Sequence, residues 1–492
     1  MEKDDNSLVS ITEPGSEVEV PKEPKRPRMF YFMRLFGFVN LVLLNVLANF
    51  QKTCPAVVAE DMALSYNVSK KSLGSFSASY YYPYGIMQII SGLLSDMFDP
   101  AIVLGVLGLV SAGGSCLVGF SKTLWIGSLG RFLVGLGTGP TYVAALKMIS
   151  NWYLKDQLPI ALGINMAFSC VGGLLSGSPL SIFCKKFGWR VAFHLFGGIS
   201  GVLSLIVLIF TRGSPEKQGF DPVNPVPVVK PDESFCKKLE TLFYNIWTVL
   251  CYGYFWVVVI FNVCTVTTFM NIAGLWAGPY LCDILGYSKT TRGNAMIALH
   301  IGVFIGSGIL PPIAKWVKTK KYVLIFSAIF TFLPIFALYL HGDHVSYVMI
   351  WVYFTILGTF SRSVLSLDYP ILTSYYTPLV SGSAVGIANF FLNFGVAVFQ
   401  LISTDIIPRY GSIPTSSDVD MYTWEGYKNG LWLFSSVCAS VAILMGIIMK
   451  DPDDKLCNKV EKTNNDVLAQ SLLLDEVQKP IIIEEPQAEQ KS

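Results

Sequence analysis

Long apolar stretches alternate with short polar segments along most of the chain. We place twelve such stretches at residues 31–52, 73–94, 101–121, 124–148, 158–183, 190–211, 248–280, 291–313, 322–341, 346–370, 382–405 and 429–449. A helix needs about 20 predominantly apolar residues to cross a membrane, and each stretch reaches that length. The pattern therefore predicts an all-α membrane protein with twelve transmembrane helices.

Polar segments at both ends and in the middle divide the chain. Residues 1–30 precede the first stretch, a proline-rich segment at 212–247 separates the sixth from the seventh, and an acidic tail fills 451–492. We therefore expect two six-helix bundles, at 31–211 and 248–450, that are joined by a cytoplasmic linker and flanked by cytoplasmic tails.

Charged residues beside the first stretch predict the orientation. Basic side chains cluster there, at Lys22, Lys25, Arg26 and Arg28, and such clusters stay on the cytoplasmic side. An even number of helices returns the C-terminus to the same side. The sequon Asn67-Val68-Ser69 lies in the first loop, so we expect Asn67 to be glycosylated on the opposite side. Which membrane holds the protein is left open.

Composition excludes several classes of protein. Charged residues make up 14% of the 492 residues and the formal net charge is +2, whereas soluble domains carry about 25% charged residues. The sequence contains no Cys-x-x-Cys pair, phosphate loop or nucleophile elbow. We therefore expect no enzyme, cofactor, metal or nucleic-acid partner, but a monomer whose partners are a small solute, the lipid bilayer and, in one alternative, protons.

The two halves share short sequence patterns at corresponding helices. The pattern Ser-Lys-x-x-x-Gly begins at Ser69 before the second stretch and at Ser288 before the eighth. The pattern Ala-x-Gly-Ile begins at Ala161 in the fifth stretch and at Ala384 in the eleventh. These matches predict pseudo-symmetric bundles with a binding site between them near the bilayer midplane.

Three segments carry a resemblance to a known family. Residues 92–96 read Gly-Leu-Leu-Ser-Asp and residues 130–137 read Gly-Arg-Phe-Leu-Val-Gly-Leu-Gly. Both resemble motifs of the major facilitator superfamily, and residues 274–281 resemble its subset labelled nitrate-transporter-like. The resemblance implies a transporter that works by alternating access, with Gly92 and Asp96 in a gating loop. It does not imply a substrate.

Few charged residues fall inside the predicted helices, among them Arg131, His300, Arg362 and Asp368. A charge at this depth normally faces a cavity or a partner. Two guanidiniums on opposite bundles would suit a carboxylate or another anion; alternatively, each arginine fixes a backbone carbonyl or a neighbouring helix. Asp368 and His300 are the candidates for proton coupling, although a uniporter or an exchanger fits as well.

Neutral polar residues also recur on single helix faces. The candidates for substrate binding are Asn45 and Asn49, Tyr80 and Tyr84, Asn389 and Asn393, and the isolated Asn165, Asn271 and Trp276. Amides at this depth either bond across helices or face a wet cavity. Trp276 is either an aromatic anchor at the membrane interface or part of an outer gate.

These observations favour a secondary transporter, by uniport or proton symport, of a small anionic or zwitterionic organic solute, such as an organic acid, amino acid or short peptide. Two alternatives stay open. Tyr80, Tyr81, Tyr82 and Tyr84 would also suit an exporter of amphipathic compounds or drugs. A nutrient-sensing receptor that signals through the 451–492 tail is the other.

Overall fold

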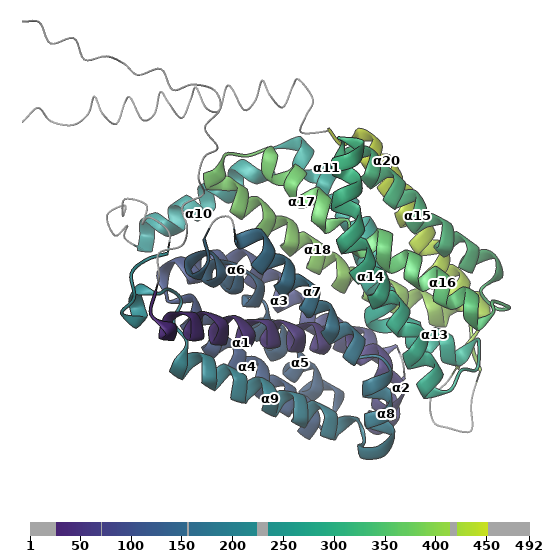
Figure 1. Cartoon of the computed structure of the whole chain (residues 1–492). Coiled ribbons are helices and arrows are strands. Elements are labelled where there is room, and N and C mark those ends of the chain that lie inside the picture. Colours follow the sequence, from purple (N-terminus) through teal and green to yellow (C-terminus); the bar gives the residue numbers. More distant parts are fainter. Residues whose placement is uncertain (1–25, 70, 155–156, 224–234, 414–420, 451–492) are drawn as a thin grey trace, which may run out of the picture.

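Two helical bundles lie side by side in the computed structural model, which describes residues 26–69, 71–154, 157–223, 235–413 and 421–450 (Figure 1). The predictions for the two tails, including Lys22 and Lys25, concern segments outside the described residues. Within them, helix occupies all twelve predicted stretches, which confirms the all-α membrane fold.

The N-terminal bundle contains nine helices that form six spans. They are α1 (Arg28–Thr53), α2 (Pro55–Tyr66), α3 (Ser72–Met97), α4 (Pro100–Phe120), α5 (Leu124–Thr138), α6 (Thr141–Trp152), α7 (Leu158–Leu175), α8 (Ser178–Phe187) and α9 (Trp189–Phe210). Proline at the first turn of a helix starts it cleanly, and Pro55 begins α2 directly after α1. The pair α7 and α8 bends by 41°.

The C-terminal bundle is interrupted by π-helical turns, which are rare and often lie at functional sites. Its helices are α11 (Gly253–Asn262), η2 (Val263–Thr267), α12 (Thr268–Asn271), η3 (Ile272–Trp276), α13 (Ala277–Asp283), α14 (Lys289–Val317), α15 (Lys320–His341), α16 (Tyr347–Leu357), η4 (Gly358–Arg362), α17 (Leu365–Ser374), α18 (Pro378–Ile406), η5 (Ile407–Tyr410), α19 (Trp424–Tyr427), η6 (Lys428–Leu433) and α20 (Phe434–Ile448). Strands β1 (Ser412–Ile413) and β2 (Met421–Tyr422) pair antiparallel after η5.

The predicted linker contains helix that its proline-rich composition did not indicate. A short turn, η1 (Glu216–Gln218), is followed by α10 (Phe235–Leu250). One face of α10 packs on α18, where Asn245 Nδ2 lies 3.4 Å from Ser383 Oγ. The opposite face exposes the aromatic side chains of Phe243, Tyr244 and Trp247.

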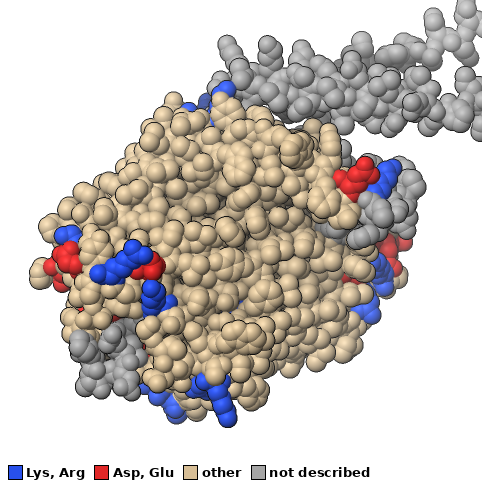
Figure 2. Space-filling view, turned by 180° about the vertical axis from the view of Figure 1, so that it is seen from behind, with Lys and Arg blue, Asp and Glu red and all other residues tan. Residues whose placement is uncertain are grey.

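The outer surface suits a membrane. Ten helices or continuous helix runs among the described residues are long and apolar enough to span, and the bent pair α7 and α8 can supply an eleventh. The 26-residue α3, rich in Ser and Tyr, fills the remaining predicted span. In Figure 2, a broad band of the visible face carries no charged side chain, and charged residues gather toward its edges.

Ion pairs join the bundles at one end, which we call the Asn67 end; the opposite end, where α1 begins, is the Arg28 end. At the Asn67 end Asp61 pairs with Lys289, Glu60 lies 2.9 Å from Arg292, and Lys71 lies 3.0 Å from Asp405. Every ion pair that joins described residues of the two bundles lies at this end. The structure is therefore closed at the Asn67 end.

Candidate functional site

A buried lysine lies where the bundles meet near the middle of the spans. Lys52 of α1 is 6% exposed. Its Nζ donates to Asn393 Oδ1 of α18 at 3.3 Å and lies 4.5 Å from the centre of the Tyr84 ring and 5.5 Å from that of Tyr81. A cation over an aromatic face is attracted by the ring. No carboxylate among the described residues pairs with Lys52.

Arg362 supplies a second cation from the opposite bundle. It ends the π-helical turn η4 in the middle of the α16–α17 span and is half-buried. Its guanidinium forms no hydrogen bond or ion pair with the described residues. It interacts electrostatically with Lys52, His300 and Asp368. Cations of both bundles therefore face one region.

Arg131, the third cation, is fully buried in α5. Its Nη1 donates to the Gln51 carbonyl oxygen at 2.5 Å, and its guanidinium lies 4.6 Å from the centre of the Tyr80 ring. Its Nε and Nη2 atoms have no hydrogen-bond partner among the described residues. The alternative in which this arginine fixes a backbone carbonyl is thus observed, and that carbonyl belongs to the residue before Lys52.

The two candidates for proton coupling are both buried. His300 of α14 packs against Gly173 of α7, so it lies at the contact between the bundles. Asp368 of α17 is fully buried beside Asn262. Neither carboxylate oxygen of Asp368, and neither amide atom of Asn262, has a hydrogen-bond partner of ordinary geometry among the described residues.

The predicted amide faces divide into structural and site-facing residues. Asn45 donates to Asn165 Oδ1 at 3.0 Å, and Asn49 donates to Ser169, so both bond across helices within one bundle. On α18, Asn389 accepts from the Tyr369 hydroxyl at 2.5 Å. Asn393 instead holds Lys52 of the other bundle.

Trp276 lies inside the protein. It is 1% exposed, and its Nε1 donates to Ser403 Oγ at 2.8 Å. The Ser403 hydroxyl also lies 3.1 Å from Asn271 Oδ1. Because Trp276 is buried, it is not an aromatic anchor at the membrane interface. It lies near the contact between the two bundles, on the side of the Asn67 end.

The loop candidates lie apart from this centre. Gly92 lies in α3 with open space beside its Cα, and the side chain of Asp96 lies outside what the structure describes. Asn67 is exposed and ends α2 with a φ of 52°. Neither Gly92 nor Asn67 contacts the central cations.

The predicted binding residues did not include Lys52 or Tyr81, and Gln400 was recognised only as part of the polar face that it shares with Asn389 and Asn393. A signal for Lys52 was present, because positions 45, 49 and 52 share one helical face. We treated Lys52 as the border of the first span. Tyr81 entered only as part of a tyrosine cluster, and the shared helical face of positions 389, 393 and 400 indicated a polar stripe but not which of its residues lies at the site.

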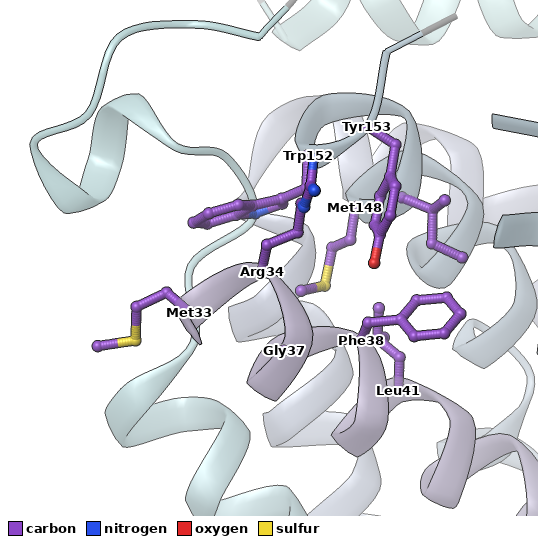
Figure 3. Close-up of a pocket in the computed structure, with 9 residues that line it drawn as sticks. Met33, Arg34, Gly37, Phe38, Leu41, Met148, Trp152 and Tyr153 are labelled. Atoms are coloured by element: carbon purple, nitrogen blue, oxygen red, sulfur yellow. The ribbon is translucent and has the colours of Figure 1, made fainter. Parts of the chain in front are cut away.

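A small hollow at the Arg28 end is separate from the central region. Figure 3 shows it between α1 and α6, lined mainly by apolar and aromatic side chains around Arg34. The Arg34 guanidinium lies 5.0 Å from the centre of the Tyr153 ring. The hollow lacks the convergent polar groups that a polar solute needs.

Sequence comparisons relate most of the chain to transport proteins. The family model described as Major Facilitator Superfamily matches residues 41–400. A probable sulfoacetate transporter of Cupriavidus necator is 29% identical over 38% of this chain and 40% of its own length. A hexuronate transporter of Bacillus subtilis is 23% identical over 64% of this chain and 79% of its own. The membrane sensor protein UhpC of Escherichia coli is 22% identical over 80% and 87%.

Solved structures support the same fold. A bacterial homologue of the human lysosomal transporter Spinster aligns with a TM-score of 0.61 at 15% identity, over 88% of this chain and 98% of that one. The nucleoside transporter NupG aligns with a TM-score of 0.63 at 15% identity, over 83% and 99%. At this identity the likeness concerns the fold alone.

Proposed function

The chain belongs to the Major Facilitator Superfamily, and on that basis we propose that it is a secondary transporter that moves a small organic anion by alternating access. Lys52 and Arg362 carry the proposal, because they approach one region from opposite bundles. A ligand that binds both side chains contacts both bundles at once. Such a ligand can couple its own binding to their relative motion.

The charge balance of the interior favours a negative cargo. Four charged residues are buried among the described ones, namely Lys52, Asp99, Arg131 and Asp368. Asp99 lies away from the centre, where it caps α4 and pairs with Lys217 at 3.1 Å. A buried ion carries a penalty of several kcal/mol unless it is paired. Asp368 alone cannot balance the positive charges of Lys52, Arg131 and Arg362, and a bound anion would supply the missing negative charge.

The named relatives agree with an anion. Sulfoacetate and hexuronates, which name two of them, are organic anions. Within the predicted class we favour organic acids over amino acids and peptides. A zwitterion also brings an ammonium group, which would add to the excess of cations (Lys52, Arg131 and Arg362) over Asp368.

The direction of opening follows from the contacts between bundles. Basic residues Arg26 and Arg28 flank the start of α1, so we place the Arg28 end in the cytoplasm. The ion pairs at the Asn67 end then close the side away from the cytoplasm. Release of these pairs and closure of the Arg28 end would turn the site outward.

Proton coupling is the finer form of the proposal. The buried carboxyl of Asp368, which has no hydrogen bond of ordinary geometry among the described residues and interacts with Arg362, suits a group that binds a proton in one state and releases it in another. In this form Asp368→Asn keeps anion exchange but loses stimulation by a pH gradient. An unchanged response to the gradient would favour uniport.

The test uses purified protein in liposomes and counterflow of sulfoacetate and D-glucuronate. Arg362→Gln should lower uptake about tenfold or more, because a charged hydrogen bond contributes about 1.5–3 kcal/mol. Arg190→Gln is the matched control, since Arg190 bonds to the Ser121 carbonyl in its own bundle. Full activity of Arg362→Gln toward both anions would reject the proposal and favour the exporter of amphipathic compounds.

A sensor is the second candidate, because the relative that matches 80% of this chain is named a membrane sensor protein. Deletion of residues 451–492 distinguishes the two. A transporter keeps its flux without the tail, whereas a sensor that signals through the tail loses its output and shows little flux to begin with.

A further inference from the structure

Among the described residues whose buried neutral polar atoms lack a hydrogen bond of ordinary geometry, three lie close to the contact between the bundles. The unpaired atoms are Tyr81 Oη, Asn271 Nδ2, Gln400 Nε2 and Gln400 Oε1. Each of the three residues is 0% exposed. We call them the amide–phenol cluster. They come from α3, α12 and α18, so both bundles contribute.

Two members of the cluster lie against a glycine in a π-helical turn. A Cβ at Gly274 in η3 would lie 3.2 Å from Tyr81 Oη and 3.5 Å from Gln400 Nε2. The phenol and the amide therefore lie against the same bare stretch of backbone. The Asn271 amide is oriented by Ser403, which contacts its oxygen and leaves its nitrogen unpaired.

The amide–phenol cluster adjoins the cationic region. The ring of Tyr81 lies 5.5 Å from Lys52 Nζ, and the Tyr81 hydroxyl lies next to Gly274, as the Gln400 amide does. One tyrosine thus connects the cation to the neutral polar groups. The cluster lies toward the Asn67 end, where the contact between the bundles is closed.

The unpaired polar atoms of the amide–phenol cluster favour a ligand that forms hydrogen bonds with them. A buried polar group without a hydrogen bond destabilises the protein by about 1–3 kcal/mol, and four of them lie here. Amide N–H, amide C=O and phenol groups together offer donors and an acceptor. A hydroxyl group both donates and accepts, so a set of hydroxyls is the neutral ligand that matches them.

We propose that the transported anion is polyhydroxylated, as a sugar acid or a sugar phosphate is. Its negative group binds Lys52 and Arg362, and its hydroxyls bind Tyr81, Asn271 and Gln400. This inference rests on the proposed function and narrows its substrate class. Opening at the Asn67 end separates Tyr81 from Gly274 and admits the hydroxylated part of the cargo.

The test compares anions that share a charge but differ in hydroxyls. D-Glucuronate is paired with tetrahydropyran-2-carboxylate, which has the same ring and carboxylate but no hydroxyls, and glucose 6-phosphate is paired with inorganic phosphate. Inhibition of counterflow measures each apparent affinity. We expect about tenfold or greater preference for the hydroxylated member of at least one pair, because a site built for hydroxyls disfavours analogues that lack them.

Single substitutions test whether the amide–phenol cluster causes the preference for the hydroxylated anion. Tyr81→Phe and Gln400→Met should each lower the preference for the hydroxylated anion about fivefold, since each removes about one hydrogen bond to it. Tyr82→Phe is the matched control, because the Tyr82 ring packs on Phe394 outside the cluster. Melting temperatures of the purified variants identify any that fail to fold, and Tyr81→Phe keeps the ring.

The outcomes separate this inference from the proposed function. Equal affinity for both members of each pair, or an unchanged preference in Tyr81→Phe and Gln400→Met, would overturn the hydroxyl site and leave the atoms to bound water. The proposed function would still hold if Arg362→Gln weakened every anion. If Arg362→Gln weakened none, the proposed function itself would fail.

Discussion

Lys52 Nζ in the first bundle donates to Asn393 Oδ1 in the second at 3.3 Å. Every other hydrogen bond between described residues of the two bundles lies at the Asn67 end. The Asn393 amide oxygen thus accepts the hydrogen bond of the lysine. An anionic cargo must displace a neutral acceptor, which is a weaker competitor than a carboxylate.

Asn393→Asp should therefore inhibit transport. A carboxylate at this position forms an ion pair with Lys52, competes with the cargo and compensates a buried charge. We expect counterflow of D-glucuronate to fall about tenfold and the melting temperature of the purified protein to rise. Asn393→Leu is the control, because it removes the acceptor without adding charge and should keep transport. Wild-type flux in Asn393→Asp would contradict the role of Lys52.

Lys52→Met tests the same lysine by removing its charge. A buried ion without an ion-pair partner carries a desolvation penalty of several kcal/mol, and methionine has a similar volume but no charge. We expect a higher melting temperature together with loss of anion transport. Lys147→Met should change stability in the opposite direction, because Lys147 donates to the Ser95 carbonyl at 2.6 Å. A lower melting temperature in Lys52→Met would show that its present contacts already compensate the charge.

Hydropathy predicted the helices because each membrane span is a long run of consecutive apolar residues. Hydropathy did not predict the π-helical turns. Each of these turns holds one extra residue, and the packing between helices that stabilises it cannot be read from a run of apolar residues. On a regular α-helix, Ser366, Tyr369 and Thr373 would share one face with Arg362. The turn η4 and the break before α17 change that register, and the Thr373 hydroxyl bonds to the Pro370 carbonyl.

Only part of the site could be predicted, because a sequence pattern shows which residues are unusual in a span but not which residues face each other. Arg362 stood out because charge is rare in a span, and Lys52 did not because it falls at the border of an apolar stretch. Asn45 and Asn393 look alike in sequence. Asn45 forms a hydrogen bond within its own bundle, whereas Asn393 bonds to Lys52 of the other bundle. Only the tertiary structure distinguishes the two residues.

Charge reversal at the Asn67 end should shift the conformational equilibrium. Glu60→Arg and Arg292→Glu each place like charges together, and a partly exposed pair contributes about 0.2–1 kcal/mol. We expect each single variant to open this end a few-fold more often and the double variant to restore closure. Cys282 is a built-in reporter, since its Sγ lies 3.7 Å from the Glu60 carboxylate.

Alkylation of Cys282 by a membrane-impermeant maleimide measures this opening. Its rate should rise in each single variant and return toward wild type in the double variant. Cys282→Ser in each background shows which part of the signal comes from this thiol. Equal rates in all four proteins would mean that the ion pair does not hold this end closed.

Gly278 in α13 should also be required for closure. A Cβ at this position would overlap the carbonyl oxygen of Ala56 in α2, whereas Gly308 in α14 has nothing within 4 Å of an added Cβ. Small residues let helices approach this closely. We expect Gly278→Val to raise Cys282 alkylation and to abolish counterflow, while Gly308→Val behaves as wild type. Normal counterflow in Gly278→Val would mean that the helices separate without loss of function.

Asn67 tests the orientation on which the direction of opening depends. Its side chain is exposed at the end of α2, in the sequon that Val68 and Ser69 complete. If this end faces the lumen during synthesis, protein made in eukaryotic cells should carry a glycan there. Peptide N-glycosidase F should then increase its gel mobility, and Asn67→Gln should migrate as the digested form does. A sequon engineered into the 318–320 turn at the Arg28 end should stay unmodified, and its modification would reverse the orientation proposed here.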